Sequence, residues 1–269
     1  MNLRDAVAVL TGAGSGIGRA TALALAGRGC HLAIADINGE ALAATAALVE
    51  GSGVRVSQHP LDVADRAAVA ALPEAVLAAH GKVSLVINNA GVALGGRFEQ
   101  VSEADFDWLM RINFDSVVCM TRAFLPHLRT QPEARLVNLS SLFGLISPPG
   151  QAAYSASKFA VRGFSNALRH ELAGSSVGVT VVHPGGVATA IASSAKVPLG
   201  ADAQMIERHR RAAQKMLRLP PEKAAAIIVR GIENNRARVL VGNDALIVSW
   251  IERLLPVGYW KLFARHDIG

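Results

Sequence analysis

The sequence predicts an α/β fold in which a parallel sheet is covered by helices on both faces. Six or seven short apolar segments alternate with segments of helical periodicity over about 240 residues. The connections between the apolar segments are long enough to hold a helix, as crossovers between parallel strands require. Nothing in the 269 residues requires a second core, so we expect residues 1–269 to form a single doubly wound domain.

The composition argues against several classes of protein. Hydrophobic residues make up 51% of the chain, which is wrong for a disordered protein. No segment offers about 18 uninterrupted apolar residues and the chain starts without an apolar leader, so we expect a soluble, cytoplasmic protein. The net charge of +6 comes mostly from scattered basic residues, and nucleic acid is not an expected partner. Cys30 and Cys119 lie far apart without metal-ligand spacing, so neither a disulfide nor a metal site is expected.

The first apolar segment, residues 6–11, ends in a cluster of glycines, and a helical pattern follows to Gly27. A strand, a glycine loop and a helix in this order present backbone N–H groups and a helix N-terminus to a phosphate. Gly12 would permit the tight turn, Gly16 the close approach of a pyrophosphate, and Gly18 the packing of the helix on the strand. The spacing is Thr-Gly-x-x-x-Gly-x-Gly, and the alternative is a glycine-rich turn without a ligand.

Asp36 ends the second apolar segment, residues 31–35. A carboxylate at the end of a second strand can accept hydrogen bonds from the ribose hydroxyls of an adenosine, and it repels a 2′-phosphate. No Lys or Arg stands at Ser15, Ile37 or Asn38, where a cation could hold that phosphate. Asp36 therefore favours NAD over NADP, and the alternative is an aspartate that caps a helix or forms a turn before Asn38.

The alternation continues with a helix at about 40–50, a strand at 54–59, a helix at about 65–80 and a strand at 84–87. Asp62 follows the third strand, near where an adenine would lie. Asn88-Asn89-Ala90-Gly91 follows the fourth strand, and small and amide residues there suit the crevice in which open parallel sheets bind ligands. The alternative for this segment is a turn built from residues that tolerate left-handed backbone.

A long helical pattern at 106–128 contains Asn113 among mostly apolar residues. A buried amide must be hydrogen-bonded, so we expect Asn113 to cap or kink the helix or to hold a water. The fifth strand, residues 135–139, is followed directly by Ser140 and Ser141.

Tyr154 and Lys158 lie four residues apart in an Ala-rich segment of helical periodicity, and two further strands are expected at 177–182 and 238–241. Residues i and i+4 share one face of a helix, so the Lys158 ammonium would lie within a few ångströms of the Tyr154 phenol. The positive charge would lower the pKa of the phenol from about 10, which makes the pair a proposed general acid/base. The alternative is a half-buried tyrosine beside a solvated lysine on a surface helix.

In their order and spacing these motifs resemble those of the short-chain dehydrogenase/reductase family, over about residues 6–190. The resemblance is carried by Thr11-Gly12-x-x-x-Gly16-x-Gly18, Asp62, Asn88-Asn89-Ala90-Gly91, Asn113, Ser141, Tyr154-x-x-x-Lys158 and Pro184-Gly185-x-Val187-x-Thr189. It implies a Rossmann-type fold of about seven strands that binds a nicotinamide dinucleotide. The cofactor-binding residues that it implies are Gly12, Ser15, Gly16, Ile17, Gly18, Asp36, Asp62, Val63, Asn89, Ala90, Gly91, Tyr154, Lys158, Pro184, Gly185, Val187 and Thr189.

The family's catalytic tetrad corresponds to Asn113, Ser141, Tyr154 and Lys158. Ser141 is preferred over Ser140 because the family's serine precedes its tyrosine by thirteen residues. The implied reaction is hydride transfer between the nicotinamide and a carbonyl or carbinol carbon. Tyr154 would exchange a proton with the substrate oxygen, and Ser141 would stabilise charge on that oxygen. Lys158 would hold the nicotinamide ribose and lower the pKa of Tyr154, and Asn113 would fix a water that relays protons.

Two segments lie beyond the matching motifs. Residues 190–220 correspond to the family's variable substrate lid, whose basic cluster at 208–211 we expect to be a solvated face rather than a site for an acidic substrate or an acyl carrier. In the extension 243–269, one helical face is apolar, and aromatic residues lie between cations after Pro256. We favour a dimer contact or a lid over an apolar substrate for this extension; interfacial membrane attachment and a loose tail are the alternatives.

We therefore expect an NAD-dependent alcohol dehydrogenase or ketone reductase that acts on a lipophilic or cyclic secondary alcohol. The resemblance also implies a homodimer or homotetramer that assembles through helices at about 106–129 and 152–173. One alternative, an NADPH-dependent 3-oxoacyl reductase of lipid metabolism, is disfavoured by Asp36. The other, a non-enzymatic dinucleotide-binding protein, is disfavoured because all four catalytic positions are filled.

Overall fold

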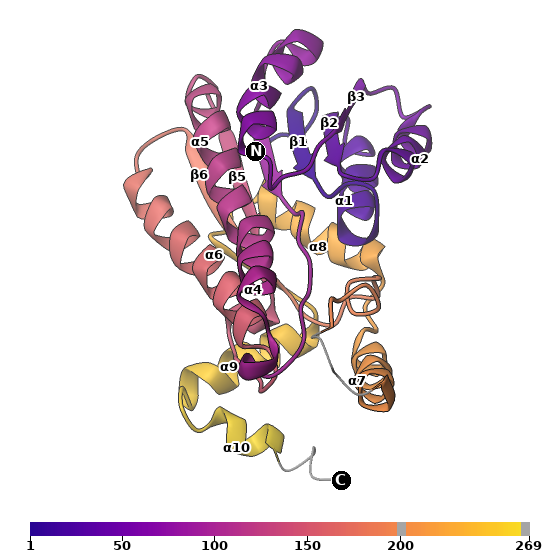
Figure 1. Ribbon diagram of the computed structural model, residues 1–269. Coiled ribbons are helices and arrows are strands. Elements are labelled where there is room, and N and C mark those ends of the chain that lie inside the picture. Colours follow the sequence, from indigo (N-terminus) through magenta and orange to yellow (C-terminus); the bar gives the residue numbers. More distant parts are fainter. Residues whose placement is uncertain (198–202, 265–269) are drawn as a thin grey trace.

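The computed structural model describes residues 1–197 and 203–264, which form a seven-stranded sheet with helices on both faces (Figure 1). The strand order is β3-β2-β1-β4-β5-β6-β7. Every neighbouring pair of strands is parallel, so the carboxyl ends of the strands meet along one edge of the sheet. The fold class that the sequence predicts is confirmed.

The strands and helices end close to where the sequence pattern places them. The strands are β1 (Val7–Thr11), β2 (His31–Asp36), β3 (Val56–Pro60), β4 (Leu85–Asn88), β5 (Ala134–Leu139), β6 (Val177–Pro184) and β7 (Arg238–Val241). The helices are α1 (Gly16–Ala26), α2 (Gly39–Val49), α3 (Arg66–His80), α4 (Glu103–Met110), α5 (Ser116–Arg129), α6 (Ala152–Glu171), α7 (Ala203–Met216), α8 (Pro221–Glu233), α9 (Asn243–Leu254) and α10 (Tyr259–Ala264). Short 3₁₀ turns lie at Phe98–Gln100 and Leu142–Gly144.

One predicted element is divided in the structure. The helix expected at 106–128 consists of α4, a π-helical turn at Arg111–Asp115, and α5. A π turn inserts one extra residue into a helix without ending it, so the chain stays helical from α4 through the turn into α5. The division therefore could not be read from the pattern.

The two faces of the sheet bury separate cores because side chains alternate along each strand. Leu10 and neighbours on its face pack beneath α1, α2 and α8. Val9 points to the other face, where it joins Phe124 and the apolar sides of α3, α5 and α6. Both faces are thus covered, which accounts for the nearly continuous apolar character of the strand sequences.

The crevice of the sheet lies where β1 has β2 on one side and β4 on the other. Connections leave these strands toward opposite faces, and open α/β sheets bind ligands at such a switch point, outside the carboxyl ends of the strands. Thr11 ends β1 and Asn88 ends β4, so the two segments with ligand-binding patterns meet at this point.

The helices α9 and α10 extend from the body of the molecule at its lower end in Figure 1. α9 buries Ala245 and Val248 against the body. Residues 198–202 of the expected lid and 265–269 of the extension lie outside the described residues, as do the side chains of Arg208 and His209 in the basic cluster. Within the described ranges, no helix combines the length and the apolar character needed to cross a membrane.

Candidate active site

Three of the expected catalytic residues gather where β5 ends and α6 begins. Ser141 follows β5, and its hydroxyl accepts a hydrogen bond from the backbone N–H of Phe143 at 3.1 Å. Tyr154 and Lys158 lie one turn apart in α6, and their exposed fractions are 8% and 4%. The Lys158 ammonium nitrogen lies 5.7 Å from the centre of the Tyr154 ring. A phenol, a hydroxyl and an amine thus share one buried site at the carboxyl edge of the sheet.

The two adjacent serines point in different directions, as side chains alternate at the end of a strand. Ser140 is buried, and its hydroxyl donates a hydrogen bond to the carbonyl oxygen of Lys158 at 2.8 Å. The Ser141 hydroxyl is instead hydrogen-bonded to the Tyr154 phenol. The position next to the phenol therefore belongs to Ser141, while Ser140 ties the loop to the backbone of α6.

Asn113 lies in the π-helical turn and is fully buried. Its amide oxygen accepts a hydrogen bond from the N–H of Val92 at 2.8 Å, and its amide nitrogen donates to the Val92 carbonyl at 3.0 Å. The same nitrogen donates to the hydroxyl of Ser157 in α6 at 3.1 Å. Asn113 therefore joins the loop after β4 to the catalytic helix, a partnership that the isolated amide in the sequence did not reveal.

Burial governs the protonation of the Tyr154–Lys158 pair. It raises the pKa of the Tyr154 phenol above its ordinary value of 10.0, and the hydrogen bond with Ser141 lowers it in part. Burial also lowers the pKa of Lys158 from 10.5 to about 8. Our expectation that Lys158 lowers the pKa of Tyr154 is wrong for the protein chain by itself, because loss of hydration disfavours the charged form of both groups.

The glycine loop lies at the N-terminus of α1, where the first backbone N–H groups of a helix have no acceptor inside the helix. Gly12 has a positive φ of 64°, which its tight turn requires. A Cβ on Gly18 would lie 1.9 Å from the Gly12 carbonyl oxygen, so α1 can pack against the loop only with glycine there. Ser15 and Ile17 stand between these glycines at the start of the helix.

Four hydrogen bonds that the sequence does not predict join the ends of β1 and β4. The Asn89 side-chain amide donates hydrogen bonds to the carbonyl oxygens of Thr11 at 2.9 Å and Gly12 at 3.0 Å. In return, the Thr11 hydroxyl accepts from the backbone N–H groups of Asn89 and Ala90, each at 3.1 Å. These four bonds fix the glycine loop against the loop after β4, and the one signal for them was a threonine directly before the first glycine.

Asp36 organises the adjacent part of the crevice. Its carboxylate accepts hydrogen bonds from the N–H of Gly14 at 2.8 Å and from the N–H of Asn38 at 2.9 Å. The N-cap of α2 is Asn38, whose side chain accepts from Ala41, so Asp36 is not the capping residue that one alternative proposed. Asp36 stands between the glycine loop and α2, with its charge at the end of β2.

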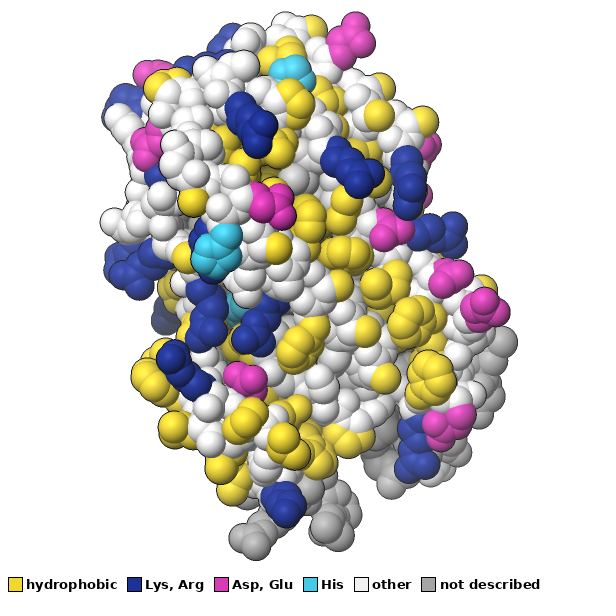
Figure 2. Space-filling model, turned by 90° about the vertical axis from the view of Figure 1, so that its left-hand side faces the viewer, with side chains coloured by type: hydrophobic (Ala, Val, Ile, Leu, Met, Phe, Trp, Pro, Cys, Tyr) yellow, Lys and Arg dark blue, Asp and Glu magenta, His cyan; other side chains and the backbone are white. Residues whose placement is uncertain are grey.

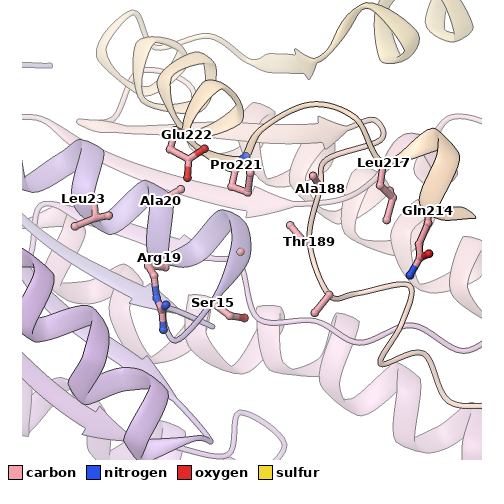
Figure 3. A pocket seen from close by; sticks show the side chains of 12 residues that line it. Ser15, Arg19, Ala20, Leu23, Ala188, Thr189, Gln214, Leu217, Pro221 and Glu222 are labelled. Carbon is pink, nitrogen blue, oxygen red and sulfur yellow. The ribbon is translucent and has the colours of Figure 1, made fainter.

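One cation near Asp36 lies outside the positions considered in the sequence. Arg19 of α1 donates hydrogen bonds to the carbonyl oxygens of Gly14 at 2.5 Å and Ala41 at 3.2 Å, and to the Thr45 hydroxyl at 3.0 Å. Figure 3 shows its side chain extending away from the loop that carries Thr189. Arg19 is thus occupied in holding the glycine loop to α2.

Asp62 and Val63 follow β3 at the same edge of the sheet. The Asp62 carboxylate accepts a hydrogen bond from the N–H of Ala64 at 2.9 Å, and Val63 is buried in the core beneath α3 and α5. The turn after β3 is therefore fixed by its own backbone and by the core.

A cavity of about 450 Å³ lies between α1, the loop after β6 and the start of α8 (Figure 3). Ser15 and Gly16 line it on one side, and Ala188 and Thr189 line it on the other. Its lining does not include Tyr154 among the described residues, so the cavity adjoins the glycine loop rather than the phenol.

Pro184 ends β6, and the loop after it, which contains Gly185, Val187 and Thr189, is held by α9. The Asp244 carboxylate accepts hydrogen bonds from the N–H of Gly186 at 2.6 Å and from the N–H of Ala245 at 2.9 Å. No local pattern predicts this contact, because its two partners lie 58 residues apart.

The segment that precedes residue 198 crosses the loop after β4. Lys196 pairs with Leu94 in a parallel bridge, and its ammonium forms an ion pair with Asp105 of α4. The same nitrogen lies 5.1 Å from the centre of the Trp108 ring. The hydrogen bond from Lys196 lowers the pKa of Asp105 below its ordinary value. This part of the expected lid is therefore anchored over the catalytic side of the crevice.

Apolar side chains surround the phenol. Tyr154 belongs to a buried cluster with Leu94, Leu109 and Ala153, and the ring of Phe143 meets it edge-on, with the ring centres 6.1 Å apart. Partly buried residues extend the cluster, namely Val92, Ala93, Val101, Phe106 and Trp108. A proton-exchanging group in apolar surroundings suits a substrate with one polar oxygen and an apolar body.

The sequence matches the family model described as short chain dehydrogenase over residues 6–198. The chain belongs to the short-chain dehydrogenase family. The match ends within the lid and includes every expected site residue from Gly12 to Thr189. The short-chain dehydrogenases are oxidoreductases, so family membership gives the class of this protein.

Relatives of this short-chain dehydrogenase extend the match toward its C-terminus. The chain is 45% identical to SadH of Mycobacterium tuberculosis over 260 residues, which cover 96% of this chain and 94% of SadH. It is 34% identical over 189 residues to the 3-oxoacyl-(acyl-carrier-protein) reductase FabG of Thermotoga maritima, covering 70% and 77% of the two chains. A crystal structure of a short-chain dehydrogenase/reductase from Burkholderia phymatum in complex with NAD is 33% identical, with a TM-score of 0.88 and 95% of each chain covered.

Proposed function

We propose that the protein is an NAD-dependent oxidoreductase that interconverts an apolar secondary alcohol and its ketone. The observation that carries the proposal is the Tyr154 phenol, which is hydrogen-bonded to Ser141, stands one helical turn from Lys158 and is surrounded by apolar side chains. A non-enzymatic dinucleotide-binding protein would have no use for a phenol, a hydroxyl and an amine in one buried site.

The chain's own features fit a nicotinamide dinucleotide. A Cβ on Gly16 would lie 3.0 Å from the methyl carbon of Thr189, so glycine at this position keeps the approach to the N-terminus of α1 open. The unpaired N–H groups and the dipole of α1 suit a pyrophosphate there. Two segments would hold the dinucleotide, namely residues Gly12 to Gly18 and residues Pro184 to Thr189. Asp62, Val63, Asn89, Ala90 and Gly91 would complete its site. When bound, a nicotinamide dinucleotide supplies the hydride acceptor or donor.

Each catalytic side chain has a role that its position supports. The phenolic oxygen of Tyr154 gives a proton to the substrate oxygen in reduction and takes it in oxidation. Ser141 hydrogen-bonds to that same oxygen and stabilises its developing charge. Lys158, whose pKa of about 8 lies close to neutral pH, exchanges protons with Tyr154 and with solvent. Asn113 positions the loop after β4 beside Lys158.

The preference for NAD rests on Asp36. Its carboxylate lies at the end of β2 beside the glycine loop, where it would accept hydrogen bonds from ribose hydroxyls and repel a 2′-phosphate. Arg19 also lines the cavity and keeps its positive charge, but its guanidinium is directed at Gly14, Ala41 and Thr45 rather than at the place of a 2′-phosphate in this proposal. The NAD complex of the Burkholderia relative agrees with this proposal.

The second candidate is an NADPH-dependent 3-oxoacyl reductase, which the similarity to FabG favours. The charge at Asp36 argues against it, and so does the apolar cluster around Tyr154, which offers little to a thioester and its carrier.

We further propose that residues 190–220 act as the substrate lid of a single domain covering 1–269. The assembly that we propose is a homodimer or homotetramer formed through α4–α5 and α6.

The experiment is a screen of secondary alcohols and ketones, from cyclic and steroid compounds to 3-oxoacyl thioesters, with NAD(H) and NADP(H) followed by the absorbance of the reduced nicotinamide. We expect turnover of apolar cyclic substrates with NAD(H), and a preference for NAD that Asp36→Asn reduces about tenfold. Glu74→Gln, which removes a carboxylate at an exposed position of α3, is the control. Turnover of thioesters with NADPH alone would establish the second candidate, and no turnover in any arm would contradict both.

A further inference from the structure

The helices α9 and α10 carry a large share of the exposed apolar surface. Among the described residues, thirteen large hydrophobic side chains are exposed, and seven of them lie between residues 246 and 262. Figure 2 shows hydrophobic side chains gathered at the lower end of the molecule, which is where α9 and α10 lie in Figure 1. The seven are Leu246, Ile247, Trp250, Leu254, Leu255, Val257 and Leu262. A concentration of this kind marks an interaction site rather than ordinary surface.

The orientation of α9 is the reverse of that of a typical surface helix. It packs against the body through Ala245, Val248 and Ser249, which are small or medium-sized. Its larger side chains face away from the body, and Trp250 and Leu254 are 58% and 72% exposed. A surface helix normally turns its apolar stripe toward the core. The stripe on α9 is therefore available to a partner.

The patch is held in place by a contact with the catalytic side of the protein. The Tyr259 hydroxyl of α10 accepts a hydrogen bond from the backbone N–H of Ser147 at 3.0 Å. Ser147 lies in the loop between Ser141 and α6. α10 also continues from α9 through a hydrogen bond from the N–H of Tyr259 to the Leu255 carbonyl at 3.0 Å. These contacts argue against a loose tail.

Basic side chains border the patch. Arg253 of α9 and Lys261 of α10 are exposed within it. Burial, together with repulsion from Arg162 and Arg253, holds the pKa of Arg238 on β7 below its ordinary value, while Glu252 acts in the opposite direction. Three guanidinium groups therefore lie within electrostatic reach of one another with one carboxylate among them, and Figure 2 shows Lys and Arg side chains beside the hydrophobic ones.

We propose that α9 and α10 form an interfacial docking surface for an anionic lipid bilayer. Trp250, Leu254 and their apolar neighbours enter the boundary between headgroups and acyl chains, and Arg253 and Lys261 contact the anionic headgroups. A second copy of the chain fits this face less well. Both surfaces in a two-fold contact would carry the same basic border, so the contact would bring two positively charged surfaces together, whereas an anionic surface neutralises that charge.

The test is co-sedimentation of the full chain with vesicles of phosphatidylcholine containing phosphatidylglycerol, and with vesicles of phosphatidylcholine alone. We expect the protein to pellet with the anionic vesicles, with at least about tenfold weaker binding for Trp250→Ser/Leu254→Ser. The matched control is Leu48→Ser/Phe98→Ser, which removes two exposed apolar side chains elsewhere and should pellet like the wild type. Arg253→Gln/Lys261→Gln should weaken binding to anionic vesicles, and Lys82→Gln/Lys223→Gln, at exposed sites elsewhere, should not.

Circular dichroism and thermal unfolding of each variant verify that it is folded. Two results would overturn the proposal: wild-type protein that stays in the supernatant with anionic vesicles, or a Trp250→Ser/Leu254→Ser variant that is folded and pellets as the wild type does. Should the wild type fail to pellet while this variant changes from a dimer to a monomer in sedimentation equilibrium, the face is instead covered by a second copy. None of these outcomes depends on which alcohol or cofactor the enzyme uses.

Discussion

Asn113 and Lys158, which come from different helical elements, approach the same backbone position from two sides. A Cβ on Gly91 would lie 3.2 Å from the amide oxygen of Asn113 and 3.3 Å from the ammonium nitrogen of Lys158. Gly91 therefore keeps the space between these two polar atoms clear. A methyl group there would force one of them to move, although the backbone of the loop could remain where it is.

Gly91→Ala tests whether that space matters for turnover. We expect kcat/KM to fall by about 10- to 100-fold, because a small displacement of Lys158 or Asn113 disturbs the geometry around Tyr154. The free energy of unfolding should fall by about 1 kcal/mol, since the crowding involves a few atoms. The measurements are steady-state kinetics and denaturant unfolding.

Gly163→Ala is the matched control for Gly91→Ala. Gly163 is exposed in α6, and a Cβ there meets nothing within 4 Å. This substitution should leave turnover unchanged and stabilise the protein by about 0.5–1 kcal/mol, because alanine restricts the unfolded chain and favours the helix. Equal kinetic effects of the two substitutions would contradict a role for the space beside Gly91.

Tyr154→Phe removes the phenolic oxygen and leaves the ring. We expect kcat to fall by about 10²- to 10⁴-fold, the usual contribution of general acid/base catalysis, with the dissociation constant for NAD nearly unchanged. Tyr259→Phe, at the other of the two tyrosines in the chain, should retain turnover. A Tyr154→Phe enzyme with most of the wild-type activity would exclude Tyr154 as the acid/base.

The fold and most site positions could be predicted because they depend on short-range patterns. Buried parallel strands read as continuous apolar runs, and the glycine spacing before α1 is local. The division of the helix at 106–128 could not be predicted, since the π turn that carries Asn113 keeps the chain helical and has no helix-breaking residue to mark it. The direction of the Tyr154 pKa was also missed, because i, i+4 spacing shows that Lys158 is near but not how deeply both groups are buried.

Contacts between distant segments are the second class of feature that sequence reasoning missed. Arg19 reaches Thr45, and Asp244 reaches Gly186, across 26 and 58 residues. The sequence spacing of each pair does not distinguish Arg19 or Asp244 from a charged residue on the surface without a partner. Such contacts depend on how helices lie on the sheet, and only the three-dimensional arrangement reveals them.

Lys158→Met should raise the free energy of unfolding at pH 7 and remove most of the turnover. The pKa of Lys158 in the folded protein is about 8, below its ordinary value of 10.5, so folding of the protonated form is penalised by about 3 kcal/mol at pH 7. Stability of the wild type should therefore rise with pH between about 8 and about 10.5, where the unfolded chain holds the extra proton.

The methionine variant should be more stable than the wild type at pH 7 and have little turnover. Its advantage in the free energy of unfolding should shrink as the pH rises through the same range, since methionine does not titrate. Urea unfolding at several pH values measures this difference. Lys223→Met, at an exposed site in α8, serves as the control, and a Lys158→Met variant whose advantage does not change with pH would show that burial of the charge is not the cause.

Asp244→Asn tests whether α9 positions the loop after β6. The carboxylate of Asp244 holds the N–H of Gly186 at 2.6 Å, and a charge-assisted hydrogen bond of this kind contributes more than a neutral one. Removing the charge should raise the dissociation constant for NAD by about tenfold, corresponding to about 1.4 kcal/mol, while kcat at saturating cofactor changes little. Fluorescence titration with NAD and steady-state kinetics give the two values. Glu252→Gln on the same helix should leave NAD affinity unchanged, because the described interaction of Glu252 is with Arg238 of β7 and not with Gly186. If Asp244→Asn lowers kcat and leaves NAD affinity as it was, the contact with Gly186 affects the chemistry rather than the binding loop.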